Sequence, residues 1–495
     1  MMSKRINRFL ALLFVVGLTM AGPPARHSAG ASSPQQPSMA KSNARNAAIV
    51  AATTEVLTET SELRELAILR PVKSGAQSRS EIERMLINNL NEQMTKAEMH
   101  ATEVSLRKFG LAPADFEYRP FIIKLLTEQV AGYYDPKAQE FHLADWLDLE
   151  GQKPVMAHEL THALQDQHFN LRRFEKWPHG DADAELAVHT LIEGDATLAM
   201  TIYMARNPLV ALAFSRLMTT GVATEQYNQA PRAIRESLIF PYMQGLEWAT
   251  QLYRRGGWTM VSNAFTRLPL SSEQILHPEK YFVYERPMKI VLPDVTNLLN
   301  AGGSKQRPAS SNQQSAISIQ HSANSKQQRA VGNQQSAISN QKSVRPLSTL
   351  GWHRIDTDVN GEWGYYLVLD QFLNAAAESK RAAAGWGGDR YALYEGPNGQ
   401  VFLAQVAVWD TENDAREFFD AYVKRTELRY PDAKQSDPAD AETQARNSKL
   451  ESRNSYSWQT SEGQVVIELR GQRVVIVEGI PKGVDSNALL SAVSQ

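Results

Sequence analysis

One segment that cannot bury a hydrophobic core divides this chain of 495 residues into two parts. Residues 301–346 consist mainly of Ser, Gln, Asn and Ala, and the heptapeptide NQQSAIS occurs twice among them. Two copies are too few for a repeat architecture, which needs at least about three stacked units. We therefore predict a disordered insert at 301–346, with a folded region on either side of it.

The region before the insert has mainly helical patterns. A short mobile segment is expected at 32–55, because it is rich in Ser, Ala, Gln and Asn. A hairpin that turns at Asp135-Pro136 is expected within 120–144, after a helix. Further helices are predicted at about 80–109, 154–169, 183–205, 208–219, 229–238 and 240–255.

The region from 347 to 495 alternates between strand and helix patterns. Strands are expected at 391–395, 401–409, 464–470 and 473–478, and helices at about 364–384, 411–429 and 486–493. Consecutive hairpins with helices between them favour an antiparallel sheet. The predicted fold class is therefore α+β, with a mainly helical domain at 56–300 and an α+β domain at 347–495.

The composition excludes several kinds of site and partner. The 52 basic and 54 acidic residues give a net charge of −2, so bulk charge predicts no nucleic-acid partner. The chain has no cysteine, which excludes disulfides, thiolate zinc sites, a cysteine nucleophile and a lipoprotein anchor. A metal site in this chain must use His, Asp and Glu.

The N-terminus resembles an export signal. Lys4, Arg5 and Arg8 precede the apolar run 9–20, which is shorter than the roughly 20 residues of a membrane span. Ala29-Gly30-Ala31 fits a cleavage site, and an earlier cut after Ala21 is an alternative. We predict a signal peptide at 1–31 and a periplasmic or secreted protein with no stable membrane span after cleavage. The alternative is an uncleaved anchor.

The sequence Ala157-His158-Glu159-Leu160-Thr161-His162 carries the clearest chemistry. Because residues four apart share a helix face, the imidazoles of His158 and His162 can reach one ion, and Zn²⁺ accepts such nitrogens. Glu159, next to the first ligand, can act on the water of that ion as a general base.

A catalytic zinc needs a third protein ligand and an open fourth position. We predict that Glu193, in the sequence LIEGDAT, is this ligand, and that Gly194 lets two helices approach closely. His189, Glu185 and Asp195 are the alternatives, and His189 could instead hydrogen-bond to a ligand.

These residues resemble the gluzincin clan of zinc peptidases, whose members combine His-Glu-x-x-His with a glutamate on a following helix, often in Glu-Gly-x-Ala. The string HELTHALQDQHF also resembles a group of exported bacterial proteins without an assigned substrate. Further strings shared with that group are AGYYDP, YRRGGW, SSEQILHPEKY and GWGGDRYALY. In the thermolysin-like enzymes an aspartate follows the ligand glutamate by four residues, whereas this chain has Thr197 there; Asp195 or Asp166 could replace it.

The resemblance implies an exported zinc hydrolase that cleaves peptide bonds in a peptide or protein substrate. His158, His162 and Glu193 would hold Zn²⁺, and Glu159 would take a proton from the attacking water. Related enzymes stabilise the oxyanion with His or Tyr. Candidates by residue type are His277, Tyr281, Tyr133 and Tyr134.

Two other functions remain open at this point. One is a catalytically silent exported binding or scaffold protein with a structural zinc site. The other is a zinc amidase that acts on cell-wall bonds. An intact Glu159 favours an enzyme, because a structural site has no use for a general base.

Overall fold

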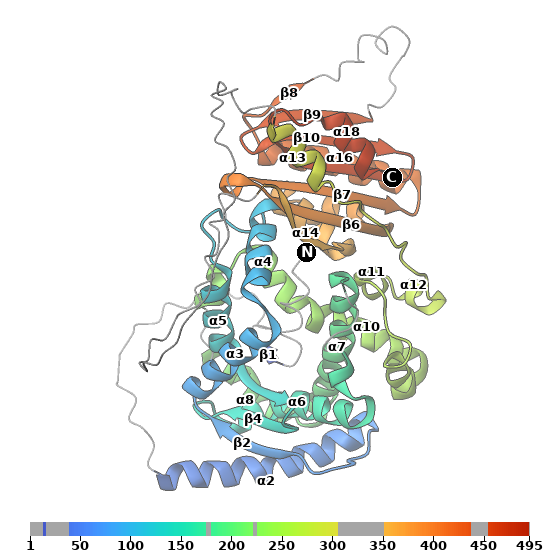
Figure 1. Ribbon diagram of the computed structural model, residues 1–495. Coiled ribbons are helices and arrows are strands. Elements are labelled where there is room, and N and C mark those ends of the chain that lie inside the picture. Colours follow the sequence, from blue (N-terminus) through green and yellow to red (C-terminus); the bar gives the residue numbers. More distant parts are fainter. Residues whose placement is uncertain are drawn as a thin grey trace, which may run out of the picture.

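The computed structural model describes residues 13–15, 39–174, 180–220, 225–304, 351–436 and 454–494. Over these residues the chain is α+β, as predicted, with a mainly helical N-terminal part and a seven-stranded antiparallel sheet in the C-terminal part (Figure 1). The predicted signal peptide lies outside the described residues except for 13–15, and the predicted insert lies outside them except for 301–304.

A small mixed sheet lies beside the helices of the N-terminal part. Its order is β1-β3-β4-β2, with β1 (Leu13–Val15), β2 (Lys73–Gln77), β3 (Val130–Asp135) and β4 (Glu140–Ala144). Strands β3 and β4 form the predicted hairpin, in which Tyr133 lies opposite His142. Strand β2, which was not predicted, pairs with β4 in parallel.

The N-terminal part contains twelve α-helices and one short 3-10 helix among the described residues. They are α2 (Met39–Arg64), α3 (Arg79–Gln93), α4 (Lys96–Lys108), α5 (Tyr118–Gln129), α6 (Leu149–Phe169), η1 (Leu171–Phe174), α7 (Ala182–Arg206), α8 (Pro208–Thr220), α9 (Glu225–Gln229), α10 (Arg232–Ala264), α11 (Ser272–Leu276), α12 (Pro278–Val283) and α13 (Thr296–Ser304).

Helix α2 differs from the prediction of a mobile segment at 32–55. Residues 39–64 are helical, and Ile49 and Val56 are buried in a cluster with Leu160 and Leu164 of α6. The prediction from the polar composition of 32–55 was wrong, because a few apolar residues on one face are enough to pack a helix against the core. Figure 1 shows α2 lying along the edge of the N-terminal part.

Two helix boundaries also differ from the predictions. The expected helix at 80–109 is two helices, because Thr95 begins α4 with a capping box that includes Glu98. The expected helices at 229–238 and 240–255 are one, α10, which bends at Gly256 and Gly257, where the backbone is not helical.

The C-terminal sheet has the order β5-β6-β7-β11-β10-β9-β8. Its strands are β5 (His353–Asp358), β6 (Trp386–Glu395), β7 (Val401–Trp409), β8 (Lys434–Ser436), β9 (Ser455–Thr460), β10 (Gly463–Arg470) and β11 (Arg473–Ile480). Its helices are α14 (Gly361–Leu373), α15 (Ala376–Ala383), α16 (Glu412–Arg429), α18 (Ser486–Val493) and the short η3 (Pro397–Gly399). The expected helix at 364–384 is two helices, since Asn374 adopts a left-handed conformation that ends α14.

Both faces of this sheet are covered. Along β11, Val475 and Val477 pack in a cluster with residues of α13 and α18, whereas Val474 and Ile476 pack in a cluster with residues of α14 and α16. This alternation follows from the two-residue period of a strand. The second cluster continues into helices α3, α4 and α5, so one apolar core includes residues of both parts.

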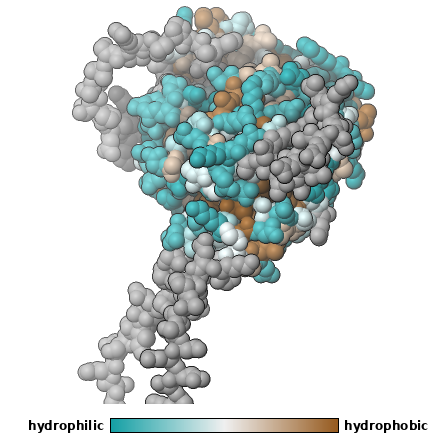
Figure 2. Space-filling model, turned by 90° about the horizontal axis from the view of Figure 1, so that it is seen from above, coloured by the Kyte–Doolittle hydropathy of each residue, from teal (hydrophilic) through white to brown (hydrophobic). Residues whose placement is uncertain are grey.

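The outer end of the C-terminal part presents a mainly hydrophilic surface with scattered apolar patches (Figure 2).

Within the described ranges, no single helix has both the length and the apolarity to cross a bilayer. Helices α7 and α8 meet that test only as a pair, which is bent by 117°.

Candidate metal centre

Helix α6 holds both histidines of the His-Glu-x-x-His sequence. It begins after Asp148, whose side chain accepts a hydrogen bond from the backbone N–H of Gly151, so Pro154 lies within the helix rather than at its start. His158 and His162 lie one turn apart and are fully buried, with their ring centroids 4.7 Å apart and nearly perpendicular. Both Nε2 atoms therefore approach one point.

Helix α7 brings Glu193 to the same point. Gly194, which follows it, lies against the backbone of Gly245, and a Cβ at Gly194 would come within 2.3 Å of the carbonyl oxygen of Gly245. The predicted close approach of two helices therefore exists, but it joins α7 to α10. Each of these glycines makes room for the other helix.

The three ligand atoms have separations suited to a metal ion. Oε2 of Glu193 lies 3.0 Å from Nε2 of His158 and 3.5 Å from Nε2 of His162, and the two Nε2 atoms are 3.1 Å apart. Ligands about 2.0–2.1 Å from a tetrahedral zinc are about 3.3 Å from one another. A buried group of His158, His162 and Glu193 could thus hold a metal ion with little movement.

The charges of this group also favour a cation. Burial lowers the pKa of His158 to about 4. Burial acts in the same direction on His162, but the charge of Glu193 outweighs it and raises the pKa of His162 to about 9. Burial alone would raise the pKa of Glu193, yet the charge of His162 and hydrogen bonds from both imidazoles lower it to about 2. A metal ion would replace the proton held between His162 and Glu193.

A chain of hydrogen bonds orients His162. Its Nδ1 lies 2.8 Å from Oε1 of Gln165, and since an amide oxygen only accepts, Nδ1 carries the proton and Nε2 is left to bind a metal. Nε2 of Gln165 donates to Asp195 on α7, and Asp195 accepts from Arg64 of α2. Asp195 therefore supports the candidate ligand His162 through Gln165. Asp195 and Asp166 were the two aspartates considered for such a role.

The carboxylate of Glu159 is held by the neighbouring hairpin. Oε2 of Glu159 accepts a hydrogen bond from the backbone N–H of Tyr134 over 2.9 Å. The hydroxyl of Tyr134 donates to Oδ2 of Asp166 over 3.0 Å, so this tyrosine links β3 to α6 at two points. Glu159 is fully buried, like the three ligand residues.

The alternative third ligands lie near Glu193 but outside the group. His189 and Glu185 precede it on α7 and are each 4% exposed. Nδ1 of His189 lies 3.9 Å from Oε1 of Glu193, and burial lowers the pKa of His189 to about 4. The group whose ligand atoms all lie within 4.8 Å of one another contains Glu193 and not His189.

The candidate oxyanion stabilisers have other partners. Nε2 of His277 lies 2.9 Å from Oε1 of Glu362 on α14, and the hydroxyl of Tyr281 donates to the carbonyl of Arg267. The hydroxyl of Tyr133 donates to Gln77. These contacts support structural roles, and a role in catalysis for His277 or Tyr281 stays a prediction.

Glu273, Glu285 and Asp410 form a second group of potential metal ligands. Unlike the first group, it already has a lysine side chain among its carboxylates. The ammonium group of Lys280 contacts all three carboxylates, at 2.7, 2.7 and 2.5 Å. The ammonium group of a lysine thus already lies among these carboxylates, and this cluster joins α11 and α12 to the loop after β7.

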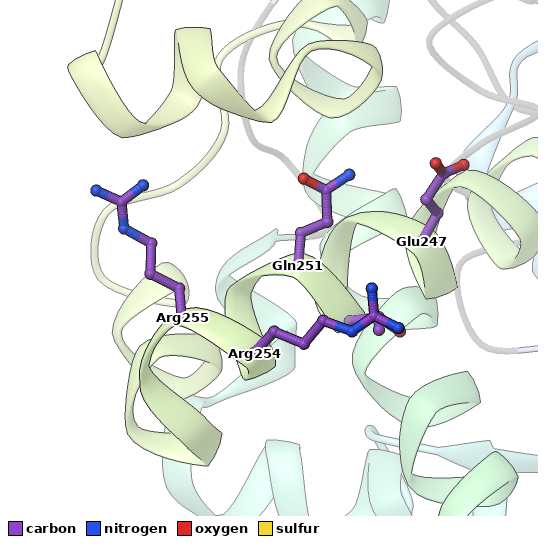
Figure 3. Close-up of a pocket in the computed structure, with 5 residues that line it drawn as sticks. Glu247, Gln251, Arg254 and Arg255 are labelled. Carbon is purple, nitrogen blue, oxygen red and sulfur yellow. The ribbon is translucent and has the colours of Figure 1, made fainter.

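A surface pocket of about 530 Å³ on α10 is separate from these carboxylates and imidazoles. Glu247, Thr250, Gln251, Arg254 and Arg255 line it. Figure 3 shows that Arg254 and Arg255 point in different directions, and the guanidinium of Arg255 lies over the ring of Phe282. The two arginines therefore do not converge on one anion.

Gln165 and Arg64 belong to the centre but were not predicted from the sequence. Gln165 could have been found, because it follows His162 by three residues and so shares its helix face. Arg64 could not, because nothing in the sequence of α2 indicates that a fully buried arginine meets Asp195.

Comparisons with known proteins concern the other part of the chain. The model of a family described as a domain of unknown function, DUF8575, matches residues 348–490. No curated protein and no solved structure matches the chain. The matched segment contains the C-terminal sheet and none of the residues His158, His162 and Glu193, so the possible metal site rests on its own geometry.

Proposed function

We propose that this protein is an exported zinc-dependent hydrolase that cleaves peptide bonds. The observation that carries the proposal is the buried group of His158, His162 and Glu193, whose ligand atoms all lie within 4.8 Å of one another. Two imidazoles and one carboxylate form the ligand set of many catalytic zinc sites, which keep a fourth position for water or substrate.

Each residue has a distinct role in the proposed reaction. His158, His162 and Glu193 would hold the zinc, which would supply an acidified water and polarise the scissile carbonyl. Glu159 accepts the proton of that water and delivers it to the leaving amine. The hydrogen bond from the N–H of Tyr134 fixes the orientation of the Glu159 carboxylate, which supports its role in proton transfer.

A second candidate is an exported scaffold protein with a structural zinc. The full burial of His158, Glu159, His162 and Glu193 favours it, since a catalytic site must admit a substrate. Under the hydrolase proposal, elements around the centre must therefore move apart when the substrate enters. A cell-wall amide is the alternative substrate.

The test uses the mature protein and two variants. Wild type should bind one zinc and cleave members of a mixed peptide library, and a chelator should abolish the cleavage. Glu159→Gln should keep the zinc and lose at least about 100-fold in rate, the usual loss on removing a general base. Glu150→Gln, on the exposed side of the same helix, is the control and should cleave like wild type.

The outcomes separate the candidates. Equal cleavage by wild type and Glu159→Gln would end the hydrolase proposal. Stoichiometric zinc without cleavage of peptides or cell-wall fragments would favour the structural role.

A further inference from the structure

His189 is a buried imidazole beside the carboxylate of Glu193. It is 4% exposed, and its Nδ1 lies 3.9 Å from Oε1 of Glu193. Among the described residues, neither ring nitrogen of His189 has a hydrogen-bond partner, and neither does Oε1 of Glu193. A donor and an acceptor thus face each other at slightly more than hydrogen-bond distance.

Packing alone does not explain a histidine at this position. Leaving a buried polar group without a hydrogen bond destabilises a fold, and an apolar side chain would fill the space without that cost. Leu186 and Ile192, three residues before and after His189 on the same face of α7, are buried in an apolar cluster, so the surroundings accept apolar side chains.

The two oxygens of Glu193 have different surroundings. Oε2 faces His158 and His162, at 3.0 and 3.5 Å, and is the oxygen that belongs with the metal ligands. Oε1 faces His189, one turn earlier on the same helix. A carboxylate that binds a metal through one oxygen keeps the other as a hydrogen-bond acceptor.

We propose that His189 is a positioning residue that donates a hydrogen bond from Nδ1 to Oε1 of Glu193 when the metal is bound. This bond restricts Glu193 to coordination through Oε2 and keeps a coordination position open for water. Closing the gap from 3.9 Å to about 2.9 Å requires only a small side-chain rotation. The inference rests on the metal site of the proposed function, but not on its being catalytic.

The test measures metal binding by the mature protein. Zinc affinity is determined by competition with a chelator, and the visible absorption of the Co²⁺ form reports coordination number. His189→Leu removes the donor, and His189→Asn supplies an amide N–H near the position of Nδ1. His168→Leu is the control, since His168 lies on α6 and contacts the carbonyl of Ala67.

We expect His189→Leu to weaken zinc binding about 10–100-fold, the usual effect of losing such a partner. The Co²⁺ absorption should also weaken, as a second carboxylate oxygen joins the ion. His189→Asn should recover most of both properties, and His168→Leu should resemble wild type. Wild-type affinity and an unchanged Co²⁺ spectrum for a folded His189→Leu would overturn the inference.

Two further results would also overturn it. Loss of zinc binding in His189→Asn as complete as in Glu193→Gln would make His189 a ligand itself. If His189→Leu does not fold, the zinc-loaded wild type should still show a slowly exchanging imidazole N–H signal in NMR that disappears in His189→Asn, and its absence would count against the inference. A wild type that binds no zinc would instead end the proposed function.

Discussion

Nε2 of Gln165 donates a hydrogen bond to Oδ2 of Asp195 over 2.9 Å and thereby joins the helix of the two histidines to the helix of Glu193. The same amide accepts the Nδ1 proton of His162. We expect Gln165→Leu to weaken zinc binding about 10–100-fold, because the orientation and tautomer of His162 are then no longer fixed. Chelator competition measures this change.

Gln167→Leu is the matched control for that variant. Gln167 lies on the same helix, but its amide bonds the backbone of Leu69 and Arg70 instead. The zinc affinity of Gln167→Leu should stay at the wild-type value. A similar loss in both variants would mean that Gln165 acts through the stability of α6 alone.

The ion pair of Arg64 and Asp195 should dominate the stability of this region. Both side chains are fully buried, with Nε of Arg64 2.5 Å from Oδ1 of Asp195. Arg64→Met leaves the buried carboxylate of Asp195 without its charged partner, so we expect a loss of about 3–5 kcal/mol in the free energy of unfolding. Urea unfolding measures it.

The pair of Arg70 and Asp166 provides a comparison. The side chain of Arg70 is 36% exposed, so solvent screens this pair, and Arg70→Met should cost about 1 kcal/mol or less. Equal losses from both arginine substitutions would contradict the role assigned to burial.

Gly194→Ala should destabilise the protein by about 1–3 kcal/mol. The added methyl group would overlap the backbone of Gly245, which cannot rotate away as a side chain can. Thermal unfolding would report the loss, and zinc affinity would fall with it if Glu193 moves. Gly75→Ala is the control, because nothing lies within 4 Å of a Cβ at that position.

The contact of His277 with Glu362 predicts a pH dependence of stability. The hydrogen bond that His277 donates to the carboxylate of Glu362 raises the pKa of His277 above its ordinary value of 6.5 in the folded protein. The stabilisation is therefore complete below pH 6.5 and is lost as the pH rises through the folded-state pKa. Unfolding by urea at a series of pH values from 6 to 9 should show this decline in wild type.

His277→Gln removes the titrating group, so the decline over that range should be smaller in the variant. An identical pH dependence in the two proteins would mean that another group is responsible. The same variant also tests the predicted role in catalysis, since an oxyanion stabiliser would lower the rate of hydrolysis without changing zinc binding.

The sequence predicted the parts of this fold that depend on local patterns. His158 and His162 were identified because a four-residue spacing fixes their common helix face. Strand β7 and helix α18 were also predicted with their observed bounds, because alternation and periodicity are regular there. Contacts between distant segments have no such local signal. For this reason the pairing of β2 with β4, the docking of α2 and the contact of Arg64 with Asp195 were not predicted.

The apolar core that both parts share limits how this chain can be dissected. Phe109, which follows α4, packs edge-on against Tyr391 of β6, and the carbonyls of Lys108 and Phe109 accept hydrogen bonds from Arg429 and Arg425, respectively. A recombinant fragment that begins at residue 348 would lose these acceptors and expose to water the part of its apolar core that packs against helices α3, α4 and α5. Such a fragment should aggregate when expressed alone, and it should recover solubility when the preceding helices are supplied as a separate polypeptide.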